Sequence, residues 1–254
     1  MKNGIFIRVT PFDHIEQQIF WYGHYEQPVA ILLENIVKPD SIVLDIGANI
    51  GYFTLIAAQK AKKGKVVAFE PVQELSKKLQ QNIRENHFQN IKVVEAAAGE
   101  SEKDSTIYLS TSENSGMSSL QPPENFSGLS QAVKIINIDQ WIKQSEIEKI
   151  DIVKLDIEGS ELFALRGMKE TLINFKPFLI VEINKNILAN FSLVPGDIMN
   201  YLTGLGYISF DISEKGELKK YSGVLLNENA AFVHSEKLKE FDLCFYNINR
   251  HGKI

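Results

Sequence analysis

The side chains best suited to chemistry gather where short apolar runs end. Residues 42–51 read IVLDIGANIG, an apolar run that is interrupted by Asp45 and closed by Gly47, Asn49 and Gly51. A carboxylate inside such a run is costly unless something pairs with it. Glycine lets the backbone turn tightly and approach a ligand closely, and asparagine tolerates a left-handed conformation. This pattern predicts a buried strand, a tight turn and a helix start that together cradle a small cofactor.

The turn differs from the two common nucleotide-binding patterns. It lacks the G-x-G-x-x-G order of dinucleotide sites, and no Gly-Lys-Ser/Thr follows as in a P-loop. A carboxylate just before the first glycine instead suits the ammonium end of S-adenosylmethionine (AdoMet), a cofactor without phosphate. The alternative is an ordinary strand–helix turn that contains a hydrogen-bonded Asp45.

A second carboxylate supports a nucleoside-containing cofactor. Residues 65–69 form another short apolar run, which ends at Glu70. An acid at the end of the second strand, about 20 residues after the glycine turn, is placed to accept hydrogen bonds from ribose hydroxyls. Asp45, Gly47, Asn49, Gly51 and Glu70 are therefore the predicted AdoMet contacts.

A third group of polar residues follows a later apolar run. Lys154, Asp156 and Glu158 alternate along residues 151–160, so extended backbone points them to one side. Such a group could orient an acceptor hydroxyl, and one of its acids could remove the proton during methyl transfer. We therefore predict these three as catalytic residues. The alternative is a structural ion network that anchors the turn at Gly159.

A metal site is not favoured by the spacing. Asp156, Glu182 and Asn184 could offer three oxygen ligands to a hard divalent ion, but they lack the adjacent Asp-Asn pair of the metal-dependent catechol-type O-methyltransferases. The five histidines show no ligand spacing. We predict AdoMet as the cofactor and no metal ligands.

Composition sets broader limits. The chain has 254 residues, 44% hydrophobic content and a net charge of −5, which argues against a dominant nucleic-acid surface. Cys244 is the only cysteine, so neither an internal disulfide nor a cysteine-based zinc site can form. No apolar run approaches the ~18 residues of a membrane span, and no leader is recognisable. We expect a soluble, cytoplasmic protein.

The apolar periodicity alternates between strand and helix along most of the chain, and no linker divides it. This pattern predicts a parallel α/β sheet with ligands at the carboxyl ends of its strands. We expect a single domain over 1–254, with an irregular aromatic segment over 1–25, a helix before residue 40, and a substrate-side loop over 110–131. Strands are expected over 41–46, 65–69, 91–95, 150–155 and 177–181, and also near 106–109, 133–136, 207–210 and 231–234. Helices are expected over 51–61, 72–86, 161–174 and 196–204, and Asp139 is expected to cap a short helix.

Several of these segments, in this order and spacing, resemble the FkbM-type methyltransferases. The matching motifs are VLDIGANIGYFTL (43–55), AFEP (68–71), AAAGE (96–100), SGMSSL (115–120), INIDQWI (136–142) and IVKLDIEGSELFALRGM (152–168). The resemblance covers about residues 20–184. It implies a Rossmann-like class I methyltransferase fold, in which a seven-stranded, mostly parallel sheet has an antiparallel last strand and helices on both faces. It also implies O-methylation of a hydroxyl on a small molecule or glycan.

By motif position, the predicted AdoMet contacts of the glycine turn and Glu70 carry over from this family. Tyr25 and Glu26 precede the first helix as they do in the family, and Glu26 is expected over the same pocket. Three alternatives remain open: a non-catalytic AdoMet-binding protein, an N-methyltransferase of the same fold, and a nicotinamide oxidoreductase. The last is disfavoured by the missing G-x-G-x-x-G.

Overall fold

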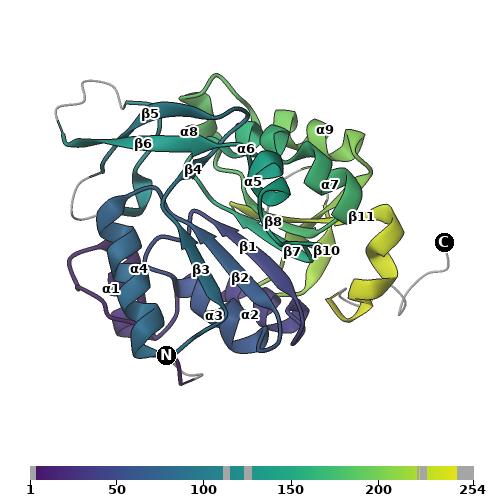
Figure 1. Ribbon diagram of the computed structural model, residues 1–254. Helices are drawn as coiled ribbons and strands as arrows, with labels where there is room; N and C mark the ends of the chain where they lie inside the picture. Colours follow the sequence, from purple (N-terminus) through teal and green to yellow (C-terminus); the bar gives the residue numbers. More distant parts are fainter. Residues whose placement is uncertain (1–3, 111–114, 123–127, 222, 224–227, 245–254) are drawn as a thin grey trace.

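The computed structural model describes residues 4–110, 115–122, 128–221, 223 and 228–244. An eight-stranded sheet forms the middle of the fold, helices cover both of its faces, and a three-stranded sheet stands at one edge (Figure 1). Among the described residues, no helix is long and apolar enough to cross a membrane.

The main sheet has the strand order β10-β9-β11-β8-β7-β1-β2-β3. The run from β8 to β3 is parallel, whereas β11 is antiparallel to β8 and β9, and β10 is antiparallel to β9. The sequence predicted the parallel α/β class and an antiparallel strand near the end of the chain correctly. The predicted count of seven strands is wrong, because β10 adds an eighth strand beyond β9. The strands are β1 (Ile42–Ile46), β2 (Lys65–Phe69), β3 (Ile91–Val94), β7 (Ile152–Leu155), β8 (Phe178–Glu182), β9 (Tyr207–Ile212), β10 (Leu218–Lys220) and β11 (Asn229–His234).

Alternate residues of the central strands face two separate cores, as the two-residue period of a strand requires. In β1, Val43 packs into the core with the N-terminal helices, while Leu44 and Ile46 pack into the opposite core. The first core involves α2 (Gln27–Ile36), α3 (Tyr52–Lys60) and α4 (Gln73–Glu85). The second involves α5 (Ile138–Lys143), α6 (Glu161–Gly167), α7 (Lys169–Phe175), α8 (Lys185–Ala189) and α9 (Pro195–Gly204).

The N-terminal aromatic segment is not irregular throughout, as the sequence analysis expected. It contains α1 (His14–Tyr22), whose first turn is capped by Asp13. The Asp13 carboxylate accepts hydrogen bonds from the backbone amides of Ile15 and Glu16, and Gly23 ends the helix in a left-handed conformation. A side-chain cap of this kind satisfies amides that would otherwise lack partners.

Two predictions near the second core are also corrected. The single helix expected over 161–174 is divided at Met168, which lies outside the helical region and separates α6 from α7. Asp139 does not cap α5, because Asn137 does so. The Asp139 carboxylate instead accepts the amides of Glu170 and Thr171 in the first turn of α7.

The small sheet consists of β4 (Ala97–Ala98), β5 (Lys103–Tyr108) and β6 (Ser130–Ile136), in the order β4-β6-β5. It carries the segment expected as a substrate-side loop. Residues 111–114 and 123–127 of that segment lie outside the described residues, and its described middle part contains the short 3-10 helix η1 (Ser115–Met117). A second 3-10 segment, η2 (Ser235–Cys244), follows β11.

Candidate active site

A pocket opens at the carboxyl ends of β1, β2, β7 and β8. Its empty space is about 950 Å³, counted out to the open mouth. Its polar and charged lining comes mainly from strand ends, as expected for an open α/β sheet. The glycine turn contributes Gly47 and Asn49, and Glu70 directly follows β2. Lys154 lies in β7, Glu182 lies in β8, and the turn after β7 contributes Asp156, Glu158 and Ser160.

Backbone hydrogen bonds hold the glycine turn against the neighbouring strand. The amides of Gly47 and Ala48 both donate to the Phe69 carbonyl at 3.0 Å. The Asn49 amide donates to one Glu70 oxygen, and the Val72 amide donates to the other, each at 2.8 Å. Glu70 is 4% exposed, and burial raises its pKa to about 7. These hydrogen bonds join the glycine turn and the end of β2 into one continuous side of the pocket, which we call the pocket wall.

The two turn glycines are needed for contacts within the protein. Both have positive φ, +88° at Gly47 and +96° at Gly51. A side chain on Gly47 would begin 1.7 Å from the Asp156 carbonyl oxygen, and one on Gly51 would begin 2.4 Å from Leu79. The sequence analysis predicted the position of the turn correctly and expected its glycines to make room for a ligand. In the structure these glycines make room for other atoms of the protein, those of Asp156 and Leu79.

Asp45 and Lys154 lie side by side on the parallel strands β1 and β7. Asp45 is 2% exposed and accepts a 2.5 Å hydrogen bond from the Thr54 hydroxyl on α3. Burial raises the pKa of Asp45, although the Lys154 charge and the Thr54 hydrogen bond oppose the shift. Its Oδ1 has no hydrogen-bond partner within the described part of the chain.

Lys154 is 1% exposed, and its positive charge lies among several carboxylates. Its Nζ donates to Asp156 at 2.8 Å and lies 4.5 Å from the centre of the Phe53 ring. Burial lowers the pKa of Lys154, but the carboxylates of Asp156, Asp45 and Glu26 outweigh burial and raise it overall. The lysine therefore stays charged, as a buried cation with several acidic neighbours should.

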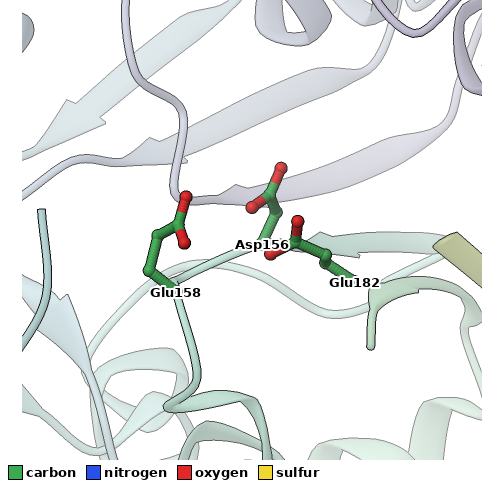
Figure 2. A group of neighbouring side chains, drawn as sticks. All are labelled: Asp156, Glu158 and Glu182. Atoms are coloured by element: carbon green, nitrogen blue, oxygen red, sulfur yellow. The ribbon is translucent and has the colours of Figure 1, made fainter. Parts of the chain in front are cut away.

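Three carboxyl groups gather beyond β7 and β8. We call Asp156, Glu158 and Glu182 the acid cluster, because one oxygen from each lies within 4.8 Å of the other two (Figure 2). Burial, followed by the Asp156 charge, raises the pKa of Glu158 to about 9. The same two causes raise the pKa of Glu182. Like charges this close disfavour full ionisation, so the cluster accommodates added positive charge or protons.

The turn that follows Asp156 has its own buried support. The Glu161 carboxylate, 1% exposed, accepts the amides of Ile157 and Gly159 at 3.0 and 3.1 Å. Glu158 adopts a left-handed conformation with φ +56°. The Ser119 hydroxyl of the opposite loop donates to the Glu158 carbonyl at 3.2 Å. These contacts fix where the Glu158 side chain begins.

The predicted site residues divide into two groups. Gly47, Asn49, Glu70, Lys154, Asp156 and Glu158 line the one pocket. Asp45, Gly51 and Glu26 are not part of its described lining. Asp45 is buried beside Lys154, behind the residues that line the pocket, and Gly51 packs against Leu79.

Glu26, which is not in the described pocket lining, is hydrogen-bonded to a residue of β11. It stands just before α2 in a left-handed conformation, and its Oε1 accepts a hydrogen bond from Asn229 at 2.8 Å. Burial raises its pKa, and the Lys154 charge opposes that shift. The Glu26 carboxylate contributes to raising the pKa of Lys154.

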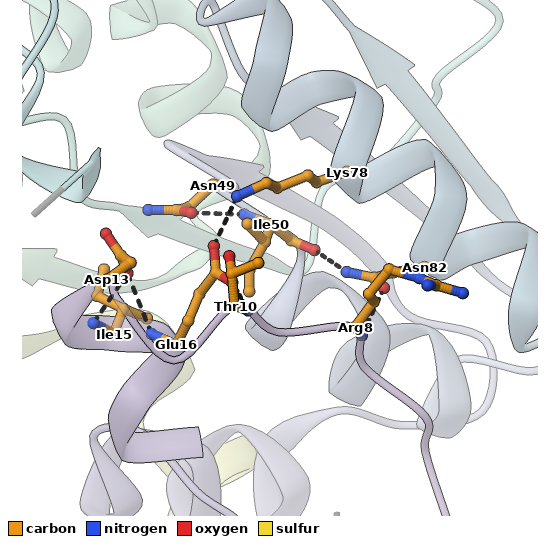
Figure 3. Close-up of polar contacts among 9 residues, drawn as sticks. All are labelled: Arg8, Thr10, Asp13, Ile15, Glu16, Asn49, Ile50, Lys78 and Asn82. Carbon is orange, nitrogen blue, oxygen red and sulfur yellow. Dashed lines mark hydrogen bonds and ion pairs between the residues drawn. The ribbon is translucent and has the colours of Figure 1, made fainter. Parts of the chain in front are cut away.

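The N-terminal segment packs against the glycine turn, a contact that the sequence did not reveal. Ile15 of α1 lines the pocket, and Glu16 forms an ion pair with Lys78 of α4 at 2.8 Å (Figure 3). The buried Asn82 side chain donates to the Ile50 carbonyl and accepts from the Arg8 amide, both at 2.9 Å. The segment before α2 is thereby tied to the turn.

Sequence reasoning also missed some lining residues. Tyr25, Gly116, Ser118 and Ser160 line the pocket, and burial raises the pKa of Tyr25. Glu182 was considered beside Asn184, but Asn184 caps α8 and donates to Glu228 instead. The sequence analysis named Glu182, at the end of an apolar strand as Glu70 is, only as a possible metal ligand and not among the predicted site residues.

The chain is similar to several known methyltransferases. AglP, a hexuronic acid methyltransferase of Haloferax volcanii, is 31% identical over 172 residues, covering 64% of each chain. The 2-O-methyltransferase NoeI of Sinorhizobium fredii is 26% identical over 150 residues, covering 53% of this chain and 60% of NoeI. The match thus spans less than two thirds of either relative.

A crystal structure of Methyltransferase FkbM from Methylobacillus flagellatus KT superposes with a TM-score of 0.51 at 20% identity, covering 78% of this chain and 44% of that one. This likeness supports the fold. The sequence model of the Methyltransferase FkbM domain matches residues 45–209, from the first strand of the site through Glu70 and the whole acid cluster. The chain belongs to the family of FkbM-domain methyltransferases.

Proposed function

We propose that this chain is an AdoMet-dependent O-methyltransferase acting on a hydroxyl of a small molecule or glycan. The observation that carries the proposal is a single pocket lined by two chemically different groups of residues. The glycine turn and Glu70 form one group, which we assign to the donor end of the pocket, and Lys154 with the acid cluster forms the other, which we assign to the acceptor end. A transferase needs this arrangement, because it must hold a donor and an acceptor together.

The donor end has the groups that AdoMet requires. Each Glu70 oxygen already accepts one backbone amide, yet a carboxylate oxygen can accept a second hydrogen bond, so ribose hydroxyls could still donate to it. Val72, Leu75 and Ala96–Ala98 supply an apolar wall that suits a purine ring. Gly47 and Asn49 also line the pocket, and in this proposal their backbone atoms contact the cofactor, as the sequence analysis expects.

Asp45, Gly51 and Glu26 support the donor end from outside the lining. In this proposal Asp45 keeps Lys154 charged and in place, and Gly51 allows the close packing on Leu79 that shapes the turn. Glu26 contributes negative charge near Lys154. These are positioning roles, which differ from the direct contacts expected from the sequence.

The acceptor end favours a hydroxyl group. Lys154 fixes Asp156 through a 2.8 Å ion pair, and the acid cluster offers several oxygens that accept a hydrogen bond from an O–H group. AdoMet, when bound, supplies a methyl group on positively charged sulfur, which the hydroxyl oxygen can attack as the carbon–sulfur bond breaks. The hydroxyl proton then passes to a carboxylate of the cluster. The names of AglP and NoeI, a hexuronic acid and a 2-O-methyltransferase, agree with such an acceptor.

A binding and transfer experiment tests the proposal. Isothermal titration with AdoMet should show binding, and Glu70→Ala should weaken it by roughly tenfold or more, the loss of about one hydrogen bond to a charged group. Glu95→Ala is the matched control, because Glu95 contacts α4 side chains and is not among the lining residues. Incubation with labelled AdoMet and a panel of sugars should then give a methyl ether. If the folded protein binds no AdoMet, the proposal fails.

A further inference from the structure

If all three carboxyl groups of the acid cluster were ionised, they would carry more negative charge than the surrounding side chains neutralise. Asp156, Glu158 and Glu182 come from the ends of the adjacent strands β7 and β8, and they converge on a common space (Figure 2). Lys154 is the one basic side chain in the described pocket lining, and its Nζ is already bonded to Asp156. Glu158 and Glu182 therefore have no cationic partner in that lining.

The neighbouring loop does not supply a positive charge by its sequence. Residues 110–131 include Glu113 and Glu124 but contain no lysine, arginine or histidine. Whatever conformation this segment takes, it can only add negative charge at this end of the pocket. The balancing charge must therefore come from protons or from a bound cation.

Ser160 gives a second, independent indication of a ligand. Its side chain is 2% exposed, lines the same pocket as the acid cluster, and lies at the start of α6 without capping it. The Oγ atom is buried and has no hydrogen-bond partner in the described structure. A buried hydroxyl without a partner is costly, and the cost is removed when a ligand supplies the missing contact.

We propose that Asp156, Glu158 and Glu182, with Ser160 of the same pocket lining as a further oxygen donor, bind one hard divalent cation such as Mg²⁺ or Mn²⁺ at the acceptor end of the pocket. Carboxylate and hydroxyl oxygens are the ligands that such ions prefer, and they retain some water when bound. The 4.8 Å spread of the three carboxylate oxygens allows all of them to contact one ion after small side-chain movements.

This inference rests on the proposed function and makes it more specific. A divalent ion next to the acceptor hydroxyl would lower the pKa of that hydroxyl, so a weakly basic carboxylate would suffice to take its proton. It would also neutralise the cluster, which lets an acceptor that itself carries a carboxylate enter the pocket. The sequence analysis named Asp156, Glu182 and Asn184 as possible metal ligands. In the structure Glu158, and not Asn184, lies close to Asp156 and Glu182.

The test measures cation binding directly. Full-length protein is treated with EDTA, exchanged into metal-free buffer and titrated with MnCl₂, while the electron paramagnetic resonance signal of free Mn²⁺ is followed. We expect one bound ion per chain. Glu158→Gln and Glu182→Gln should each weaken binding by roughly tenfold or more, since affinity follows the number of charged ligands. Ser160→Ala should have a smaller effect of the same sign.

The matched control is Glu170→Gln. Glu170 is an exposed carboxylate whose partner is Lys143, so this variant removes the same charge far from the cluster and should leave Mn²⁺ binding unchanged. The Gln variants are expected to fold, because they remove repulsion among buried carboxylates. A circular dichroism melt checks this point. Absence of stoichiometric Mn²⁺ binding by folded wild-type protein overturns the inference without any variant.

An AdoMet titration of the same metal-free protein separates this inference from the proposed function. AdoMet binding and full transfer activity after EDTA treatment, with no Mn²⁺ bound, would overturn the cation site and leave the methyltransferase standing. Mn²⁺ binding that depends on Glu158 and Glu182 supports the site even if AdoMet fails to bind, in which case the proposed function fails alone.

Discussion

The Asn49 amide and the Glu70 carboxylate are joined by a 2.8 Å hydrogen bond that connects the glycine turn after β1 to the end of β2. The second Glu70 oxygen accepts the Val72 amide. Burial raises the pKa of Glu70 to about 7, so its protonation changes near neutral pH. A donor site built on this carboxylate should therefore depend on pH.

The affinity for AdoMet should decrease as the pH falls below about 7. Ribose hydroxyls donate to an ionised carboxylate, so binding favours the deprotonated form and must displace a proton when Glu70 is protonated. The dissociation constant should then rise by up to about tenfold per pH unit. Isothermal titration between pH 5.5 and 8 measures this slope. Glu70→Gln should bind more weakly with a flatter profile, and an unchanged slope in that variant would rule out Glu70 as its source.

Lys154→Met should strongly destabilise the fold. The substitution leaves Asp45 and Asp156 without the cation that now lies beside them. Breaking a buried pair in this way costs about 3–5 kcal/mol of unfolding free energy. Urea denaturation measures the loss. Lys149→Met is the control, because Lys149 is 45% exposed and pairs with Asp40 and Asp151 near the surface. It should cost about 1 kcal/mol or less.

A double variant separates charge from packing in this experiment. Adding Asp156→Asn to Lys154→Met removes one uncompensated carboxylate and should recover part of the lost stability. If the double variant is as unstable as the sum of the two single variants, the effect of Lys154 is one of packing against Phe53 rather than of charge.

The strand ends were the most predictable part of this site. Asp45, Glu70, Lys154 and Asp156 each interrupt or end an apolar run, and a short parallel strand has few other ways to carry a charge. Their grouping follows from parallel topology, which brings the carboxyl ends of strands to one edge. Whether each side chain faces the pocket depends on register and on the face of the strand. For that reason the sequence could not show that Asp45 is buried behind the pocket lining instead of being part of it.

The parts that escaped prediction depend on long-range contacts. Ile15 reaches the pocket because Glu16 pairs with Lys78, far along the chain. No local pattern encodes that pairing. The strand β10 has three residues, two of them lysines, so its addition to the sheet depends on pairing with β9 rather than on its own periodicity.

Gly47→Ala should prevent normal folding of the turn. The added carbon would lie 1.7 Å from the Asp156 carbonyl oxygen, and the backbone has φ +88°, which side chains disfavour. We expect a loss of at least about 3 kcal/mol of unfolding free energy, in line with steric clashes against buried backbone. The comparison is Gly204→Ala in α9, where an added carbon meets nothing within 4 Å. That variant should be neutral or up to about 1 kcal/mol more stable. Thermal melts of the two variants provide the test, and equal effects would contradict it.

Asn82→Ala should weaken AdoMet binding although the residue is not part of the described pocket lining. Its buried amide links the Ile50 carbonyl of the donor turn to the Arg8 amide of the N-terminal segment (Figure 3). Loss of the side chain leaves both backbone groups unpaired, and an unpaired buried group costs about 1–3 kcal/mol. Without this hydrogen bond the glycine turn is less restrained, and AdoMet must order it on binding. The dissociation constant for AdoMet should therefore rise by roughly tenfold.

Asn86→Ala distinguishes support of the turn from general docking of the N-terminal segment. Asn86 lies one helical turn further along and is hydrogen-bonded to the amide and carbonyl of Phe6, and within the described structure it makes no hydrogen bond to the glycine turn. Hydrogen exchange at residues 6–8 should increase in both variants, because both release the segment. AdoMet affinity should fall in Asn82→Ala alone, since only Asn82 reaches Ile50 among these two side chains. An equal loss of affinity in both variants would show that the segment as a whole, and not the Asn82 bridge, stabilises the donor site.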